Sequence, residues 1–416
     1  MRRNAVTKPE VRRTTTRVTD KEGQSFMRIL EVTPYFAPAY SYGGPPETVH
    51  RLCEALAGRG HEVTVLTTDA FSSTKRQTRR HTVGSLEIFY LPNLSNYLAW
   101  NHQLFLPSGT RAFLRSHAKT FDIIHVHSFR TYQNVVVRQH ALRTNTPYLL
   151  SAHGSVPRIV RKKLAKTVFD SIVGQSVLQD AARLIAVSNA EKRQYETMGV
   201  PSSKIAVIPN GIDARQYSPL PPRGSFSRQH GLVGRKVVTY LGRLNSRKGL
   251  DTLLKSFRQL LDIRVDVSLV LAGPDDGYGR QVERMIKQLS LQEHVLFTGL
   301  VTLPEKLNVL VDSDVVVYPG SFEIFGLVPF EALLCRRPVI VADDSGCGEI
   351  IAATGGGITF PVSDSAELAR AISRTLQDGE DIKQMTERGR KFVIEHLEWG
   401  RIAEETEESY RVVLGS

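Results

Sequence analysis

The sequence has few cysteines and no long apolar run. Its three cysteines, Cys53, Cys335 and Cys347, are widely separated, odd in number and form no C-x-x-C pair. This spacing argues against a disulfide framework or a structural zinc site, and it indicates a reducing compartment. No apolar run approaches the roughly 18 residues that cross a bilayer, and the amino terminus lacks the apolar core of a secretion signal. We therefore expect a cytoplasmic protein without a membrane span.

The sequence is strongly basic. A formal charge of +12 favours an acidic partner without naming it. Part of this charge lies in residues 1–26, which carry seven basic and three acidic side chains, so we expect a disordered basic extension there. Because Met27 immediately precedes the first expected strand, this stretch could also be an over-long gene model. The chain has no aromatic-basic motif of a known nucleic-acid module, which leaves nucleic-acid binding as a remote alternative.

Length and pattern predict an α/β protein with two domains. A chain of 416 residues exceeds what one hydrophobic core usually serves. From Arg28 onward, short β-branched runs alternate with helical segments, and each series predicts a Rossmann-like, doubly wound parallel sheet. Ser218–Pro222 is rich in proline and fits a linker. The expected division is a basic extension (1–26), an N-terminal domain (27–217), a linker (218–235), a C-terminal domain (236–398) and a final helix (399–416).

Two carboxylates eight residues apart mark the most informative stretch. Val315–Val317 predicts a short buried strand, after which Glu323 lies in a loop and Glu331 on the next helix. Ligands of open α/β sheets bind outside the carboxyl ends of strands, where carboxylates accept hydrogen bonds from sugar or ribose hydroxyls. Gly326 lets a ligand approach backbone N–H groups that a Cβ would shield. For an arbitrary pair of glutamates, solvated surface positions are the ordinary interpretation.

Two basic residues follow a strand in the second half of the chain. Arg243 comes just after the expected strand Val237–Leu241, and Lys248 precedes the next helix. The planar fork of an arginine and the compact charge of a lysine suit a diphosphate, and positive charge there also stabilises a departing nucleoside diphosphate. Taken alone, an arginine and a lysine are more often solvated surface residues.

Three residues occupy strand-to-helix connections in the first half. Gly43 and Gly44 lie where the first strand passes into the first helix, which is a usual ligand turn but can also be a plain turn. His153 follows the expected strand Tyr148–Leu150, and therefore lies at the edge of the sheet where ligands bind.

Two further features are ambiguous. His125 and His127 alternate with Val126, so both point to one face of the sheet, where they either serve a site or are satisfied polar residues. Residues 156–169 combine basic side chains with an apolar stripe. That helix either lies on an anionic lipid surface or packs its apolar side on the core.

The order of these motifs resembles a known family. The stretch Pro-Gly-Ser-Phe-Glu-Ile-Phe-Gly-Leu-Val-Pro-Phe-Glu-Ala (319–332), followed by Pro-Val-Ile-Val-Ala (338–342), is similar to the signature of family 4 glycosyltransferases, the group 1 type. The resemblance implies the GT-B fold, in which two Rossmann-like domains face each other across a cleft. The second domain would hold a nucleotide sugar donor, the first an acceptor, and the final helix would cross back to the first domain.

The resemblance also implies a role for each candidate residue. Glu323 would meet hydroxyls of the transferred sugar and Glu331 the ribose, while Arg243 and Lys248 would hold the diphosphate. His153 would contact the sugar near the reacting centre. The catalytic candidates are Glu323, His153, Arg243 and Lys248; further donor-site positions are Phe325, Gly326, Leu327, Gly299 and Leu300; and positions facing the sugar or acceptor are Gly43, Gly44, His127 and His153.

The expected activity is a retaining transfer of a hexose from a nucleotide diphosphate sugar to a lipid-linked or polysaccharide-precursor glycan. We expect no metal or other cofactor, and possible peripheral contact with the anionic inner face of the cell membrane. A GT-B epimerase or hydrolase acting on the same nucleotide sugar is the main alternative. Cys335-Arg336-Arg337-Pro338 and Gly346-Cys347-Gly348-Glu349 depart from the usual family pattern, which leaves the choice of donor open.

Overall fold

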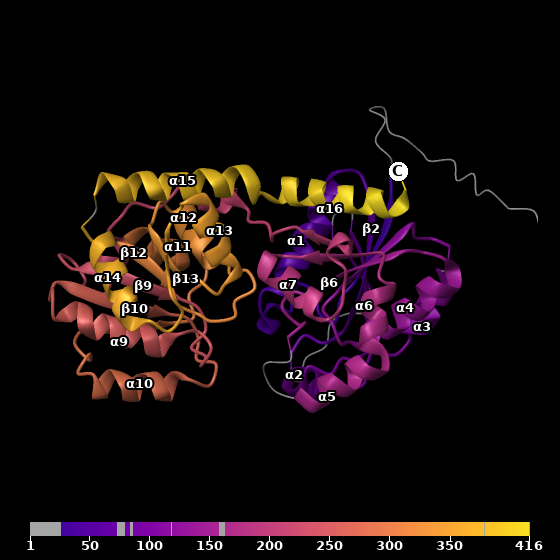
Figure 1. Ribbon diagram of the computed structural model, residues 1–416, viewed down its shortest axis with the longest axis horizontal. Coiled ribbons are helices and arrows are strands. Elements are labelled where there is room, and N and C mark those ends of the chain that lie inside the picture. The colour runs from indigo at the N-terminus through magenta and orange to yellow at the C-terminus, as the bar shows by residue number, and fades with distance from the viewer. Residues whose placement is uncertain are drawn as a thin grey trace, which may run out of the picture.

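The computed structural model describes residues 26–72, 80–83, 86–117, 119–157, 163–377 and 379–415. These residues form two α/β domains that lie side by side (Figure 1). The predicted fold class is therefore confirmed. The basic extension (1–26) lies outside the described residues except at its last position.

The N-terminal domain is built on an eight-stranded sheet. Its strands are β1 (Arg28–Val32), β2 (Glu62–Thr68), β3 (Arg80–Val83), β4 (Leu86–Leu91), β5 (Ile123–His127), β6 (Tyr148–Ser151), β7 (Arg183–Ala186) and β8 (Ile205–Val207). They lie in the order β3-β4-β2-β1-β5-β6-β7-β8, and only the β3–β4 pair is antiparallel. Its helical elements are η1 (Tyr40–Tyr42), α1 (Pro45–Gly58), α2 (Asn96–His102), α3 (Thr110–Ser116), α4 (Tyr132–Thr144), α5 (Lys163–Phe169), η2 (Asp170–Gly174), α6 (Gln175–Asp180), α7 (Asn189–Thr197), η3 (Ser202–Lys204) and η4 (Ala214–Tyr217).

The C-terminal domain is built on a six-stranded parallel sheet. Its strands are β9 (Lys236–Leu241), β10 (Val267–Ala272), β11 (Val295–Gly299), β12 (Val315–Tyr318), β13 (Val339–Ala342) and β14 (Ile358–Phe360), in the order β11-β10-β9-β12-β13-β14. The helices after η4 are α8 (Ser225–Gln229), α9 (Leu250–Leu261), α10 (Gly279–Gln288), α11 (Glu305–Asp312), α12 (Val328–Leu334), α13 (Gly346–Thr354), α14 (Ser365–Thr375), α15 (Glu380–His396) and α16 (Trp399–Leu414).

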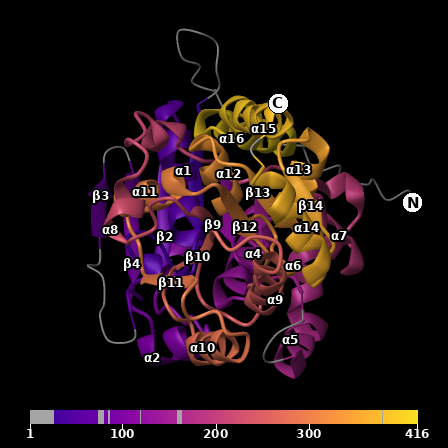
Figure 2. The same cartoon turned by 90° about the vertical axis from the view of Figure 1, so that its left-hand side faces the viewer.

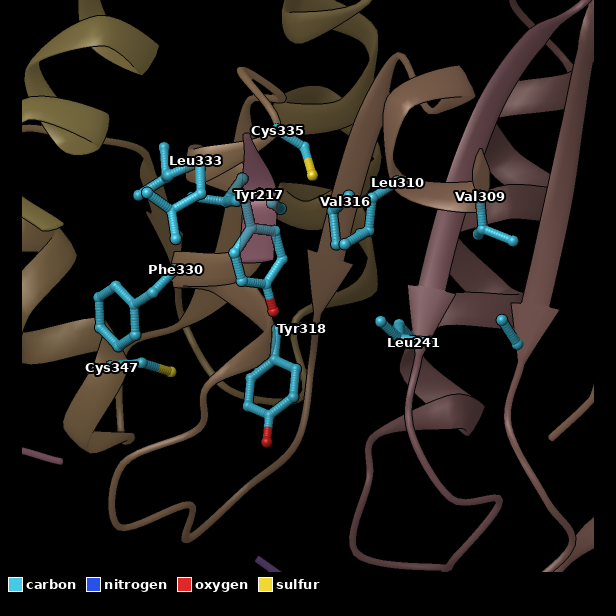
Figure 3. Packing of buried hydrophobic residues seen from close by; sticks show 14 of the residues in the cluster. Tyr217, Leu241, Val309, Leu310, Val316, Tyr318, Phe330, Leu333, Cys335 and Cys347 are labelled. Atoms are coloured by element: carbon cyan, nitrogen blue, oxygen red, sulfur yellow. The ribbon is translucent and has the colours of Figure 1, made fainter. Parts of the chain in front are cut away.

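Helices cover both faces of each sheet, so the central strands are apolar on both sides. In the C-terminal domain, Val316 and Leu241 contribute to one core together with Phe330 and Leu333 of α12 (Figure 3). Complete burial of a side chain such as Phe330 contributes about 1.5–3 kcal/mol. Tyr217 joins the same core from the end of the first domain (Figure 3).

The last two helices connect the domains. α15 lies along the C-terminal domain and α16 continues across the N-terminal domain (Figure 1), and seen along the long axis of the molecule the two helices overlap (Figure 2). Ile402, Ala403 and Tyr410 of α16 are buried in the core that contains Ile29 and Leu56. The crossing helix is therefore an integral part of the first domain although it ends the chain.

The domains also touch through α7 and α13. Glu349 of α13 forms an ion pair with Arg193 of α7, and it accepts a hydrogen bond of 3.2 Å from the backbone of Ala190. This contact joins a helix of the N-terminal domain to a helix of the C-terminal domain, so the domains meet through paired polar groups as well as through α16.

Part of the expected linker (218–235) belongs to the second domain. Phe226 of α8 and Leu232 are buried in the second core, and Asp312 accepts hydrogen bonds from the backbone of Gly224 and Ser227. The prolines at the start of this stretch are typical of a linker, but the residues that follow them include an apolar segment that packs on the core of the second domain. α14 and α15 are separate helices, because α15 begins after Gly379.

Among the described residues, no helix has both the length and the apolar content that a membrane crossing requires. Residues 158–162 of the expected basic helix lie outside the described residues, and α5 begins at Lys163.

Gly249 holds two loops together at the edge of the second sheet. It precedes α9 with φ +68°, and a Cβ built on it would lie 2.0 Å from the carbonyl oxygen of Pro319. Both the left-handed backbone and this close approach require glycine. The loop after β9 can therefore lie directly against the loop after β12.

We predict that Gly249→Ala lowers the free energy of unfolding by about 2 kcal/mol, because the new Cβ overlaps a backbone oxygen. Urea unfolding curves measure this change. Gly400→Ala is the matched control, since Gly400 lies in α16 with open space around its Cβ position, and alanine there favours the helix. Equal stability of Gly249→Ala and the natural protein would contradict the proposed close contact.

Candidate active site

In each sheet the strand order reverses beside the first strand of the domain. The chain runs from β9 outward to β10 and β11 and then returns to β12, which pairs with β9. The same reversal lies between β1 and β5 in the first sheet. Ligands of doubly wound sheets bind at such points, outside the carboxyl ends of the strands. The two reversal points therefore select the loops after β9 and β12 and the strand ends of β1 and β5.

Glu323 and Lys248 meet at the reversal point of the second sheet. The Lys248 Nζ lies 2.6 Å from Glu323 Oε1, although the residues come from loops after different strands. Tyr318 donates a hydrogen bond of 3.0 Å to Glu323 Oε2. Burial and the charge of Glu323 hold the pKa of the Tyr318 phenol well above its ordinary value, so it remains a donor. Spacing alone could not predict this contact between Glu323 and Lys248.

Glu331 projects from α12 and pairs with a lysine that sequence reasoning missed. Lys306 of α11 places its Nζ 2.9 Å from Glu331 Oε1 and donates to the Tyr217 hydroxyl at 3.4 Å. Burial and the charge of Glu331 raise the pKa of Tyr217 well above its ordinary value. The carboxylate is thus held in place by a cation while remaining partly exposed. No local motif distinguishes Lys306 from other helix lysines.

Arg243 does not join the pair of Lys248 and Glu323. Its Nη1 lies 3.0 Å from Asp276 Oδ2, and the side chain is half exposed. An exposed pair of this kind contributes less than about 1 kcal/mol. The guanidinium can therefore exchange Asp276 for a diphosphate at small cost.

The other residues of the second domain that were predicted to bind the donor differ in their exposure. The ring of Phe325 is buried in the core, with its centroid 5.2 Å from that of the Phe330 ring, so any contact of Phe325 with the donor would have to come from its backbone. Gly326 has φ +84° and packs against Tyr318, and Leu327 precedes α12. Gly299 accepts a hydrogen bond from the backbone of Gly273, and the next side chain, Leu300, is exposed.

His153 and Gly154 bring the first domain against the Glu323 loop. A Cβ built on Gly154 would lie 2.9 Å from Ile324, the residue after Glu323. The Gly154 N–H donates to Glu191 Oε1 at 2.6 Å, and burial raises the pKa of Glu191 to about 7. The histidine turn is therefore fixed within its own domain and adjoins the second domain. Gly43 and Gly44 lie between η1 and α1, and the Cβ position of Gly44 borders open space.

A buried polar cluster lies at the reversal point of the first sheet. His127 Nε2 lies 2.6 Å from Glu31 Oε2, and His127 Nδ1 lies 2.9 Å from His153 Nε2. His125 contacts Tyr410 Oη at 2.7 Å and Ser151 Oγ at 2.8 Å. The two alternating histidines thus share one face, as predicted. Glu31 was missed, although a glutamate inside an apolar strand is a readable signal of a buried partner.

Electrostatics in this cluster favour an ionised Glu31 next to a neutral His127 and a neutral His153. Burial opposes ionisation of Glu31, yet its contacts with His125 and His127 hold the pKa of that carboxyl below its ordinary value. Burial lowers the pKa of His127 to about 4, and it holds the pKa of His153 well below the ordinary value.

Glu31, His125 and His127 are the group within the described ranges whose ligand atoms, within 4.8 Å of one another, could hold a metal ion. The Glu31 oxygen and the His127 nitrogen are, however, at a hydrogen-bonding distance of 2.6 Å. Ligands about 2.1 Å from one zinc ion in tetrahedral geometry are separated by more than 3 Å. The observed geometry is that of a hydrogen-bonded network.

We predict that the protein loses stability as the pH falls from about 6.5 towards 4. The folded-state pKa of His127, about 4, lies below the unfolded value of about 6.5, so the unfolded chain binds a proton that the folded chain excludes. This contribution is complete above pH 6.5, and its loss amounts to at most about 3 kcal/mol. Urea unfolding at several pH values measures it. His127→Gln should flatten the dependence and the exposed His102→Gln should not, whereas a pH-independent natural protein would contradict the assignment.

Family models match the two halves of the chain separately. The one described as Glycosyltransferase Family 4 matches residues 42–216, and the one described as Glycosyl transferases group 1 matches residues 223–392. An uncharacterized glycosyltransferase of Methanocaldococcus jannaschii is 26% identical over 399 residues, which is 93% of this chain and 99% of the relative. The D-inositol 3-phosphate glycosyltransferase of Kineococcus radiotolerans is 28% identical over 404 residues, 89% of this chain and 90% of the relative.

Solved structures share the architecture. Sucrose-phosphate synthase from Thermosynechococcus elongatus superimposes with a TM-score of 0.75 at 23% identity, covering 93% of this chain and 99% of the other. Anabaena HepE in complex with UDP-glucose gives a TM-score of 0.68 at 19% identity, covering 93% and 100%. The fold and the family matches together define a glycosyltransferase of the GT-B type. The chain belongs to the group 1 glycosyltransferases, family 4, as its motifs predicted.

Proposed function

We propose that the protein transfers a hexose from a nucleoside diphosphate sugar to a hydroxyl of a glycan acceptor, with retention at the anomeric carbon. The observation that carries this proposal is the pairing of Glu323 with Lys248 at the reversal point of the second sheet, 2.6 Å apart. A carboxylate there accepts hydrogen bonds from sugar hydroxyls, and an ammonium there faces the developing charge of a diphosphate.

In the proposed reaction the bond between the anomeric carbon and the diphosphate oxygen breaks, and the diphosphate leaves with the electron pair. Lys248 and Arg243 stabilise this negative charge, and Arg243 exchanges Asp276 for the diphosphate. The acceptor oxygen bonds to the same carbon, and its proton passes to the departing phosphate oxygen. Glu331 accepts from the ribose hydroxyls. These cations provide the charge compensation that a metal would supply, so we propose that no resident metal is needed.

Uridine diphosphate sugars head the donors to be tested, because the structurally similar Anabaena HepE was solved with UDP-glucose. The names of the relatives point to different sugar chemistry: one is a D-inositol 3-phosphate glycosyltransferase, and another is a synthase of alpha-maltose 1-phosphate. We propose a glycan or lipid-linked acceptor bound mainly by the first domain, on the side of His153.

We predict that one nucleoside diphosphate, with its sugars, raises the melting temperature of the natural protein. Saturation at about 100 times Kd stabilises by about 2.7 kcal/mol. Lys248→Met and Arg243→Ala should each weaken binding about tenfold or more, since each removes a charge on the diphosphate. Lys255→Met is the matched control, because Lys255 is exposed on α9 of the same domain.

The same samples are then incubated with donor and candidate acceptors. A new glycoside with the anomeric configuration of the donor supports the proposal. Release of an altered free sugar without a glycoside would favour the epimerase or hydrolase alternative. Absence of a thermal shift with every nucleotide would contradict the donor site.

We further propose that one end of the N-terminal domain contacts an anionic membrane surface. Leu164 and Val168 of α5 and Ile172 of η2 recur every fourth residue, and their exposed fractions are 78%, 49% and 75%. The alternative that the apolar side of the helix expected over 156–169 packs on the core is therefore wrong for Leu164 and Val168. Tyr97 and Trp100 of α2 are also exposed, and α2 lies at the same end of the domain in both views (Figures 1 and 2). Exposed apolar side chains with a net basic chain suit an anionic lipid surface.

We predict that the protein sediments with vesicles containing anionic phospholipid and that the double variant Leu164→Glu, Ile172→Glu loses this binding. Each glutamate removes apolar area that would be buried in the lipid and adds a negative charge that the anionic lipid repels. Ile263→Glu is the control, because Ile263 is equally exposed but lies in the C-terminal domain. Equal sedimentation of all three proteins would contradict the assigned surface.

A further inference from the structure

A chain of hydrogen bonds leads from a buried carboxylate to the candidate active site. Glu31 on β1 contacts His127 on β5 at 2.6 Å, and His127 contacts His153, just after β6, at 2.9 Å. Glu31 and His127 are fully buried, whereas His153 is partly exposed, and the next residue, Gly154, adjoins Ile324 of the other domain. Only the last member of the chain can therefore reach a substrate.

The protons of this chain can be assigned from chemistry. An ionised carboxylate accepts hydrogen bonds and donates none, so His127 must carry its proton on Nε2, facing Glu31. His127 is neutral near pH 7, since burial lowers its pKa to about 4, and its Nδ1 therefore holds a lone pair. The contact of 2.9 Å then requires His153 to donate from Nε2. A neutral His153 keeps its own lone pair on Nδ1.

The other side of Glu31 agrees with this assignment. Tyr410 of α16 donates to Glu31 Oε1 at 3.1 Å and lies 2.7 Å from His125 Nδ1, which donates to it. His125 Nε2 is then free to accept from the Ser151 hydroxyl at 2.8 Å. His125 also faces this carboxylate, since its Nδ1 lies 3.4 Å from Glu31 Oε2. Cys53 of α1 is a further ionisable group of this region, and its thiol pKa is raised well above its ordinary value by burial and by Glu31. Tyr410 therefore contacts Oε1 of Glu31, whereas His127 at 2.6 Å and His125 at 3.4 Å face Oε2.

We propose that Glu31 is a positioning residue that acts through His127: it fixes neutral His153 as the Nε2–H tautomer, so that His153 Nδ1 accepts a hydrogen bond from a hydroxyl of the bound sugar. This proposal rests on the proposed function, which places the His153 turn at the transferred sugar. It extends that function, because the chain makes His153 an acceptor and excludes both the opposite tautomer and the imidazolium. The site then selects sugars that carry a hydroxyl at this position over their deoxy analogues.

The first test reads the tautomer in the natural protein without substrate. Nitrogen-15 spectra of histidine-labelled protein near pH 7, with the His153 signal assigned through His153→Gln, distinguish a protonated from an unprotonated ring nitrogen. We expect protonation at His153 Nε2 and a lone pair on Nδ1. A proton on Nδ1, an imidazolium, or a metal bound to the nitrogens of His125 and His127 would overturn the proposal.

The second test changes the carboxylate. In Glu31→Gln the amide can donate to His127 Nε2, which allows both histidines to reverse their tautomers. We expect a proton at His153 Nδ1 and a fall in kcat of about tenfold or more, because the active-site imidazole is in the wrong tautomer. KM for the donor should change little, and the preference for the hydroxylated sugar over the deoxy analogue should shrink.

Glu407→Gln is the matched control. Glu407 is an equally buried glutamate in α16, but it pairs with Arg59 at 2.6 Å and with Arg411, away from His153. It should lose stability as Glu31→Gln does, while its His153 tautomer and kcat remain those of the natural protein. Equal kinetic and tautomer changes in both variants would show a general effect of destabilisation and overturn the proposal.

The proposed function and the positioning role of Glu31 can be contradicted independently of each other. If no donor is turned over but His153 shows the expected tautomer and Glu31→Gln reverses it, the proposed function fails and the positioning by Glu31 stands. If sugar transfer is observed but Glu31→Gln alters neither the tautomer nor kcat, the positioning fails and the proposed function stands.

Discussion

The ion pair between Lys248 and Glu323 is the interaction around which the catalytic half of the structure is arranged. Partly buried charges lose hydration, and such a pair seldom stabilises a fold more than apolar side chains of the same volume. The pair matters for its position, because the loops after β9 and β12 place one cation and one anion side by side before a ligand binds. Gly249 makes this possible, since any larger residue would push the two loops apart.

The first domain supplies a different kind of order. Glu31, His125 and His127 are buried, and hydrogen bonds connect Glu31 through His127 to the partly exposed His153. Contacts with His125 and His127 hold the pKa of Glu31 below its ordinary value. Tyr410, which donates a hydrogen bond to Glu31, belongs to α16, the helix that begins beside the C-terminal domain (Figure 1). The same helix that joins the two domains therefore contributes to the network that ends at His153. Charge in the second domain and hydrogen-bond direction in the first are complementary requirements for handling a sugar and its diphosphate.

Much of the fold could be predicted from the sequence, because buried parallel strands appear as continuous β-branched runs. Val315–Val317 and Val237–Leu241 are such runs, and the structure contains both as β12 and β9. The strands β3, β7 and β14, of three or four residues each, were not predicted. The linker was drawn over 218–235 because its first residues are rich in proline. Phe226 within it is buried in the core of the second domain, a tertiary contact that the local sequence does not indicate.

The site could be predicted in part. Glu323, Lys248 and His153 were named from motifs, and the structure brings the first two into contact and places the third beside the same loop. Lys306 and Tyr410 could not be found, because long-range partners leave no local signal. Phe325 was assigned to the donor through its motif, and the structure shows that its side chain is buried in the core, which the motif alone did not indicate.

The most direct test of the account is a crystal structure of the protein with the nucleoside diphosphate that it binds. The account predicts the diphosphate within hydrogen-bonding distance of Lys248 and Arg243, the ribose on Glu331, and the open end of the diphosphate directed towards Glu323 and His153. A nucleotide bound away from the loops after β9 and β12, or with its ribose directed away from Glu331, would contradict the central claim.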